Sequence, residues 1–209
     1  MARMRTLGVA ALVVGALAAA PAHAALTIVA GIGGAPTGVS RSNLDSLALG
    51  SLASQQIVPG VMLGLVPDAA VVQGSLSGRY AAPYLSGANG LGFGSPDQPG
   101  GVDTTRYLGT GSTGAHAGAG VTISFSTPQH YFGLLWGSVD NYNTLRFYDG
   151  ASLVGTLTGG QVTPSATGDQ GLNGTFYVNI NSDLGFDRVV ATSSQYAFEF
   201  DNIAWNARP

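Results

Sequence analysis

The stretch VTISFSTPQHYFGLLWGSVDNYNTLRFYDGASLVGT, residues 121–156, decides the fold class. In its first segment Val121, Ile123 and Phe125 alternate with polar residues, as in a β-strand with one buried face. Further along, Asp149-Gly150 separates two strand-like segments, and this dipeptide is a strong hairpin signal because it suits the positive φ angles of a type I′ turn. The stretch therefore predicts antiparallel strands joined by short turns.

The same pattern extends over most of the chain. Gly, Pro, Asn and Asp separate the strand-like segments, whereas Lys and Glu, which usually cover exposed helix faces, are almost absent. The sequence predicts an all-β fold, an antiparallel jelly-roll-like β-sandwich of about nine to eleven strands. The strand-like segments are residues 26–30, 61–66, 121–126, 131–136, 144–148, 152–156, 175–180, 188–192 and 197–205.

Residues 1–24 are typical of a secretory signal peptide. Arg3 and Arg5 precede an apolar run, and Ala22-His23-Ala24 has the small-x-small pattern of a cleavage site. The run, residues 7–20, is shorter than the roughly 20 residues of a membrane-spanning helix. We therefore expect secretion, with the periplasm as the alternative location, and no membrane span.

Residues 25–209 are expected to form a single β-sandwich domain that carries an insertion at about residues 75–120. The insertion is rich in Gly, Ser and Pro, and a loop of this length is either a mobile surface segment or an ordered functional loop. Aromatic residues spaced along it indicate partial order, because they could pin it to the sandwich. They are Tyr80, Tyr84, Phe93 and Tyr107.

Charge and residue types exclude several functions. Residues 25–209 carry six arginines and no lysine against ten aspartates and one glutamate, a net charge of −5. Nucleic acids require a basic patch, so none is expected as a partner. The chain has no cysteine and therefore no thiol nucleophile, and no serine lies in a Gly-x-Ser-x-Gly motif. His116 and His130 lack a second histidine at ligand spacing and are interpreted as ordinary surface residues.

Glu199 and Asp201 are the best candidates for a catalytic carboxylate pair, since they lie two residues apart on a predicted strand and so on one face. Glycoside hydrolysis requires two carboxyls across a cleft, and nothing in the sequence marks one. We therefore expect no enzymatic activity, with a glycoside or ester hydrolase as the alternative. Residues 168–174 resemble half an EF-hand loop, but Ile180 replaces its bidentate glutamate.

The segment SSQYAFEFDNIAW, residues 193–205, breaks the strand alternation once. Phe198 and Phe200 have one parity, whereas the next large apolar residues, Ile203 and Trp205, have the other. Either both faces of this strand are covered, or a β-bulge near the intervening Asp-Asn pair turns the carboxylate to a new place.

Three segments resemble a family of exported bacterial proteins that usually carry a PEP-CTERM sorting tail and are handled by exosortase: residues 131–150 (YFGLLWGSVDNYNTLRFYDG), 173–180 (NGTFYVNI) and 198–205 (FEFDNIAW). The resemblance implies a jelly-roll-like sandwich and association with the surface or extracellular matrix, and no known activity. After Trp205 only Asn-Ala-Arg-Pro remains, without the sorting tail, which favours free secretion or periplasmic residence over anchoring.

We expect a secreted, non-catalytic surface or extracellular-matrix module that binds polysaccharide, either exopolysaccharide or a cell-surface glycan. A purely structural or adhesive surface protein is the alternative. Sugar rings stack on aromatic faces that are flanked by amide and carboxylate groups, and the loop after residue 136 offers such a patch. The alternative is that its tryptophan belongs to the core and that its Asp and Asn residues are ordinary turn formers. The predicted ligand-binding residues are Trp136, Asp140, Asn141, Tyr142 and Asn143.

The resemblance to jelly-roll domains also implies a structural calcium ion. In many such domains an acidic residue near the first strand and another in the last help to hold calcium, and the matching positions here are Asp45 and Asp201, with Asn202 or backbone carbonyls completing the shell. A carboxylate among large apolar residues is costly to bury unless it is paired. The alternatives are that Asp201 pairs with an arginine such as Arg188, or faces water.

Overall fold

The computed structural model describes residues 24–31, 33–97, 100–110 and 120–208. The predicted signal peptide, apart from Ala24, and His116 lie outside these residues. Within them, no helix combines the length and apolar character needed to cross a membrane. The elements are β1 (Leu26–Gly31), β2 (Ser40–Ser42), β3 (Ser54–Val58), β4 (Val61–Leu65), β5 (Ala70–Gln73), β6 (Tyr84–Leu85), β7 (Gly101–Val102), β8 (Arg106–Thr110), β9 (Gly120–Gly137), β10 (Asn143–Asp149), β11 (Ser152–Thr158), α1 (Gly159–Val162), β12 (Phe176–Ser193) and β13 (Phe198–Asn206).

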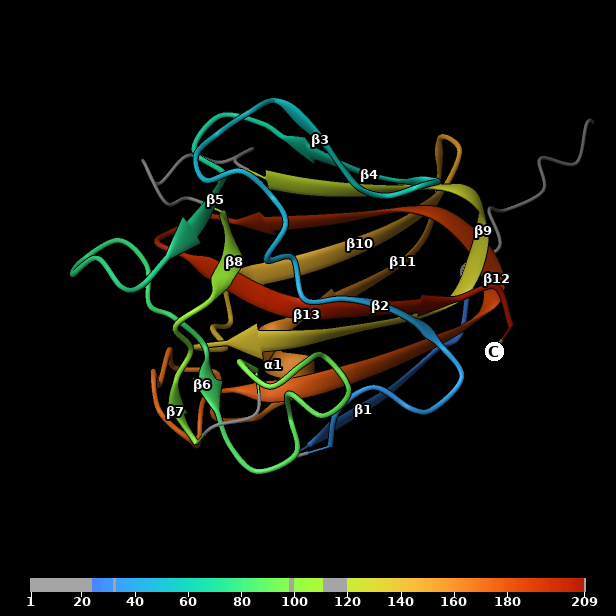
Figure 1. Cartoon of the computed structure of the whole chain (residues 1–209). Helices are drawn as coiled ribbons and strands as arrows, with labels where there is room; N and C mark the ends of the chain where they lie inside the picture. The colour runs from blue at the N-terminus through green and yellow to red at the C-terminus, as the bar shows by residue number, and fades with distance from the viewer. Residues whose placement is uncertain (1–23, 32, 98–99, 111–119, 209) are drawn as a thin grey trace, which may run out of the picture.

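Two long strands, β9 and β12, connect the two layers of the sandwich. Each has 18 residues, and the sequence had predicted two shorter strands in place of each. The first half of β9 pairs with β4 and the second half of β12, whereas the second half of β9 pairs with β13 and the first half of β12. Figure 1 shows both strands curving round at the same end of the molecule. The chain therefore changes layer within a strand.

The strand order confirms the predicted antiparallel β-sandwich. One layer runs β3-β4-β9-β12-β10-β11. The other runs β1-β12-β9-β13-β8-β5, and β2 also pairs with β13. Because β9 and β12 belong to both layers, these strands form one hydrogen-bonded sheet, and β6 and β7 form a separate pair.

The hydrophobic core lies between the layers and is rich in aromatic side chains. Phe125 of one layer contacts Trp205 of the other, with ring centroids 6.1 Å apart. Trp136 stacks on Phe198 at a centroid distance of 4.3 Å. Such aromatic pairs each contribute about 0.5–1.5 kcal/mol beyond the burial of their area, so this core can hold the fold without disulfides.

The predicted hairpin between β10 and β11 is present, and Asp149 faces Ser152 across a two-residue turn. Of these two turn residues only Gly150 has a positive φ, at 55°. Glycine with positive φ at the first central position is typical of a type II′ turn. The hairpin prediction is therefore correct, but the predicted type I′ geometry is wrong.

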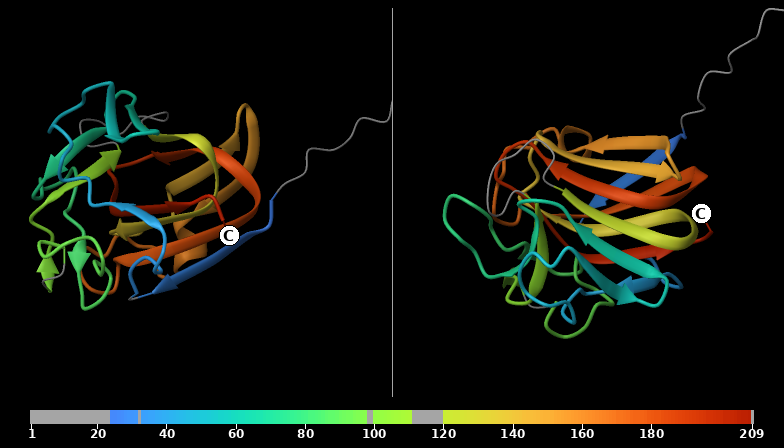
Figure 2. Two further views of the ribbon diagram at one scale, coloured as in Figure 1. Left: turned by 45° about the vertical axis from the view of Figure 1, so that its right-hand side comes forward. Right: turned by 90° about the horizontal axis from the view of Figure 1, so that it is seen from above.

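Within the described part of the insertion, β8 joins the β13-containing layer as a strand, and the segment before it packs on the outer face of that layer. Its aromatic residues hold it there: Tyr107 of β8 is fully buried, and Phe93 contacts Tyr177 with ring centroids 5.8 Å apart. Figure 1 and the left view of Figure 2 show β6 and β7 at the end of the molecule away from the bends of β9 and β12. The insertion therefore covers one face and one end of the sandwich.

Strand β13 contains the predicted bulge. Asp201 and Ala204 are three residues apart, but the β9 residues opposite them are only two apart, so β13 has one extra residue. Asn202 in the bulge has φ 51°, a conformation that Asn adopts more readily than most residues. Phe200 and Ile203 consequently both enter the core. All of β13 except its last residue is buried, so the strand has both a bulge and two covered faces.

Candidate functional site

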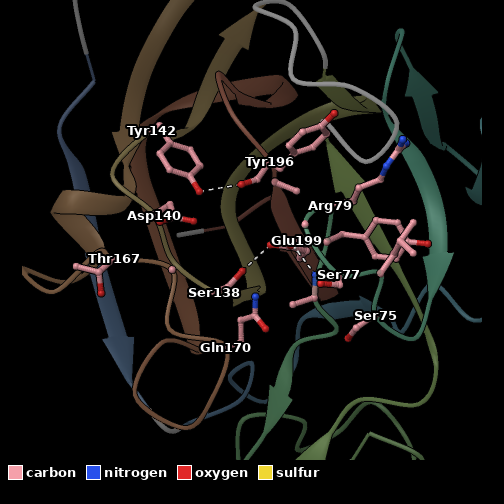
Figure 3. Close-up of a pocket in the computed structure, with 16 residues that line it drawn as sticks. Ser75, Ser77, Arg79, Ser138, Asp140, Tyr142, Thr167, Gln170, Tyr196 and Glu199 are labelled. Atoms are coloured by element: carbon pink, nitrogen blue, oxygen red, sulfur yellow. Dashed lines mark hydrogen bonds between the residues drawn. The ribbon is translucent and has the colours of Figure 1, made fainter.

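A polar pocket lies at the end of the sandwich away from the bends, where the loops after β9, α1 and β12 meet the insertion. We call it the end pocket, and its volume is about 590 Å³. Figure 3 shows that its side chains converge from these separate segments. Prominent among them are Arg79, Tyr80, Asp140, Tyr142, Gln170 and Tyr196.

Asp140 and Tyr142, in the loop after β9, form one wall of the end pocket. The Tyr142 hydroxyl donates a hydrogen bond of 2.8 Å to the Tyr196 carbonyl, which ties this loop to the one before β13 (Figure 3). Burial raises the pKa of the Asp140 carboxyl, and the nearby Tyr142 phenol lowers it. The wall therefore presents a carboxyl group beside an aromatic ring.

Glu199 of β13 lies at the floor of the end pocket and is only 2% exposed. Its Oε1 accepts a hydrogen bond of 2.8 Å from the Ala81 amide, and its Oε2 accepts one of 2.6 Å from the Ser138 hydroxyl. Burial raises the pKa of Glu199 to about 7, although both hydrogen bonds lower it. Because both oxygens are held by protein donors, Glu199 joins the insertion to the end of β9.

The predicted ligand-binding residues do not all lie together. Asp140 and Tyr142 line the end pocket, whereas Asn141 is exposed outside its lining. Trp136 and Asn143 are fully buried, and Asn143 Oδ1 accepts a hydrogen bond of 2.9 Å from a serine hydroxyl. No ligand can reach these two side chains, so placing them in a surface patch is wrong. Trp136 belongs to the core because it shares a face of the second half of β9 with Phe132 and Leu134.

Asp45 contacts protein donors of its own. Its Oδ2 accepts a hydrogen bond of 2.7 Å from the Asn43 amide group, and its Oδ1 accepts one of 3.1 Å from the Arg106 backbone. The Asn43 amide group also lies 3.4 Å from Asp97 Oδ2. Asp45 is therefore near Asp97, but it is not one of the carboxylates that gather around Asp201.

Asp201 is fully buried and does not pair with Arg188, so that alternative is wrong. The Arg188 guanidinium instead donates a hydrogen bond of 2.8 Å to the Gly150 carbonyl. The Asp201 carboxylate lies with those of Asp97 and Asp103, and one oxygen from each lies within 4.8 Å of the others. We call these three residues the acidic cluster.

Sequence reasoning missed Asp97 and Asp103 because each lies among Pro and Gly residues and is indistinguishable from a turn former. It also missed Gln170 and Tyr196, which reach the end pocket from loops far apart in sequence. The one available signal was the spacing of aromatic residues such as Tyr80 in the insertion.

Comparison of the chain with protein-family models, with curated proteins and with solved structures finds no match. The geometry of the end pocket is therefore the basis for assigning a function.

Proposed function

We propose that the protein is a secreted, non-catalytic module of the cell surface or extracellular matrix that binds polysaccharide in the end pocket. The observation that carries this proposal is the lining of the pocket, where tyrosine rings lie beside hydroxyl, amide and carboxyl groups. Its volume of about 590 Å³ is within the usual range for sites that bind small molecules or short ligand segments.

The lining fits the chemistry of a sugar. A pyranose ring has an apolar face that packs on aromatic rings, which Tyr80, Tyr142 and Tyr196 supply. Its hydroxyl groups both donate and accept hydrogen bonds, and the pocket offers Asp140 as an acceptor and Gln170 as both donor and acceptor. Exopolysaccharide or a cell-surface glycan is therefore the proposed ligand class.

Binding without hydrolysis is favoured by the contacts of Glu199. A glycosidase needs one carboxyl to protonate the leaving oxygen and a second to act on the sugar. In the described part of the chain, the acidic residues that line the end pocket are Asp140 and Glu199, and Glu199 directs both oxygens to Ala81 and Ser138. Only Asp140 is then available to a ligand.

The proposal is tested by applying the secreted protein to a glycan array and to insoluble polysaccharides. Tyr196→Ala removes a ring that is 39% exposed in the pocket, and should weaken retention about three- to tenfold. Tyr148→Ala is the matched control, because Tyr148 is a half-buried tyrosine on β10 that contacts Arg188 outside the pocket lining.

Three other outcomes would contradict the proposal. Equal retention of wild type and Tyr196→Ala would place glycan binding elsewhere. Retention on no polysaccharide would favour the structural or adhesive alternative. Release of reducing ends by the wild type, lost in Asp140→Asn, would identify a glycoside hydrolase instead.

A further inference from the structure

The acidic cluster brings together three buried carboxylates from separate segments. Asp97 and Asp103 belong to the insertion, before β7 and before β8, and Asp201 belongs to β13. Their exposed fractions are 0%, 1% and 0%. Such a group is costly to bury with its charge uncompensated, so its oxygens should have partners.

Several polar atoms at the cluster have no hydrogen-bond partner among the described residues. Both carboxylate oxygens of Asp201 are in this state, and so is Oδ2 of Asp103, whose Oδ1 accepts hydrogen bonds from Thr105. The nearby arginines do not compensate the charge: Arg41 and Arg106 donate from their guanidinium groups to backbone carbonyls. The cluster thus combines unused oxygens with uncompensated negative charge.

Asn202 provides an independent observation. Its side chain is fully buried, and neither its Oδ1 nor its Nδ2 has a hydrogen-bond partner in the described part of the chain. The amide group lies close enough to Asp97 to lower the pKa of that carboxyl. Three clustered carboxylates with an amide group next to one of them supply the kinds of oxygen donor that calcium accepts.

We propose that Asp97, Asp103, Asp201 and Asn202 bind a calcium ion that fastens the insertion to β13. Calcium fits because every donor is a hard oxygen, with neither His nor Cys among them, and because it accepts carboxylates and amides in irregular arrangements. Magnesium demands a more regular octahedron and retains several waters. Asp45 supports Asn43, which contacts Asp97, so it acts one step outside the proposed shell.

Burial supports this assignment through its effect on the carboxyls. It raises the pKa of Asp97 to about 6, and it also raises that of Asp201 well above its usual value, with the charge of Asp103 adding to the effect. The negative charge of the buried carboxylates can be neutralised in two ways, by protons on the carboxyls or by a bound cation. The proposal does not depend on the sugar pocket, because the two sites use different side chains.

The test uses the full secreted protein, freed of metal with a chelator and titrated with calcium or with terbium. Tyr107 and Tyr177 lie near enough to Asp201 for its charge to raise their pKa values, so tyrosine excitation should sensitise emission from terbium in the site. We expect saturable binding at one equivalent. Calcium at 100 times its dissociation constant should raise the melting temperature by about 5–10 °C.

Asp97→Asn and Asp103→Asn should each weaken calcium binding about tenfold or more. Asp149→Asn, at an exposed aspartate on β10, is the matched control and should bind like wild type. If the cluster variants do not fold, hydrogen exchange of the wild type replaces them, with calcium expected to protect residues 84–97. The proposal would be overturned if calcium left the melting temperature of the wild type unchanged and terbium gave no emission. It would also be overturned if Asp149→Asn weakened calcium binding as much as the cluster variants do, or if calcium did not change the hydrogen exchange of residues 84–97.

Discussion

Glu199 and Asp201 leave the same face of β13, and one insertion covers both carboxyls. Glu199 contacts Ala81 near the start of the insertion, whereas Asp201 lies with Asp103 further along it. The floor of the end pocket and the acidic cluster are therefore only two residues apart on one strand. A cation that ordered the insertion would consequently also order the insertion residues that line the end pocket.

The metal-free protein should become less stable as the pH rises from about 5 to 8. Burial raises the pKa of Glu199 from 4.5 to about 7 and that of Asp97 from 3.8 to about 6. The folded form therefore holds these protons more tightly than the unfolded chain. This stabilisation is complete below the unfolded pKa values and is lost as the pH passes through the folded ones. Urea unfolding in the presence of chelator measures the free energy at each pH.

Glu199→Gln is the control for this pH dependence. The amide oxygen can still accept a hydrogen bond from Ala81, but the side chain no longer titrates. The decrease in the free energy of unfolding near pH 7 should therefore become shallower. A wild type whose stability increased over this range would show that these carboxyls are ionised in the folded protein.

Trp136→Ala should destabilise the protein by about 3–5 kcal/mol, because it leaves a large cavity beside Phe198. Trp136→Phe should cost less, since it keeps an aromatic contact and removes a buried indole N–H that has no hydrogen-bond partner among the residues the structure describes. Urea unfolding gives both values. Polysaccharide retention per folded molecule should be unchanged in both variants, and a selective loss of retention would return Trp136 to the ligand site.

Gly168→Ala should perturb the wall of the end pocket. Gly168 has φ 74°, and a Cβ there would lie 2.8 Å from Asp140 Oδ1. We expect a loss of about 1 kcal/mol in the free energy of unfolding, together with weaker glycan retention as the carboxyl is displaced. Gly160→Ala is the matched control, since nothing lies within 4 Å of its Cβ position and its φ is not positive. Equal effects of the two substitutions would contradict the close approach at Asp140.

Local alternation was sufficient to predict most of the sandwich. It identified the inward-facing residues at Val121, Ile123 and Phe125, and the change of parity in β13 predicted the bulge. It could not show that residues 121–126 and 131–136 form one bent strand, because the residues between them, Thr-Pro-Gln-His, resemble a loop in sequence. The short strands β2, β3, β5, β6 and β7 were also missed, since each is too short to show a clear alternation.

The candidate sites were harder to predict because they depend on contacts across the sequence. Asp201 was identified from its unusual position among apolar residues, but Asp97 and Asp103 meet it only after the insertion folds over β13. Trp136 was assigned to a ligand patch from its neighbours in sequence, although it shares a face of β9 with the core residues Phe132 and Leu134. The parity of Val121, Ile123 and Phe125 could not place Trp136 either, because the core-facing residues change from odd to even numbers where β9 bends.

Asn202→Gly and Asn202→Ala should separate the backbone role of the bulge from the role of the amide group. Asn202 has φ 51°, which Gly adopts freely and Ala only with strain of about 1–2 kcal/mol. In chelator, Asn202→Gly should therefore unfold near wild type, because the amide has no hydrogen-bond partner in the described part of the chain, whereas Asn202→Ala should be less stable. In calcium both should lose part of the stabilisation gained by wild type. Urea melts in the two conditions measure this, and a full calcium response in Asn202→Gly would exclude the amide from the shell.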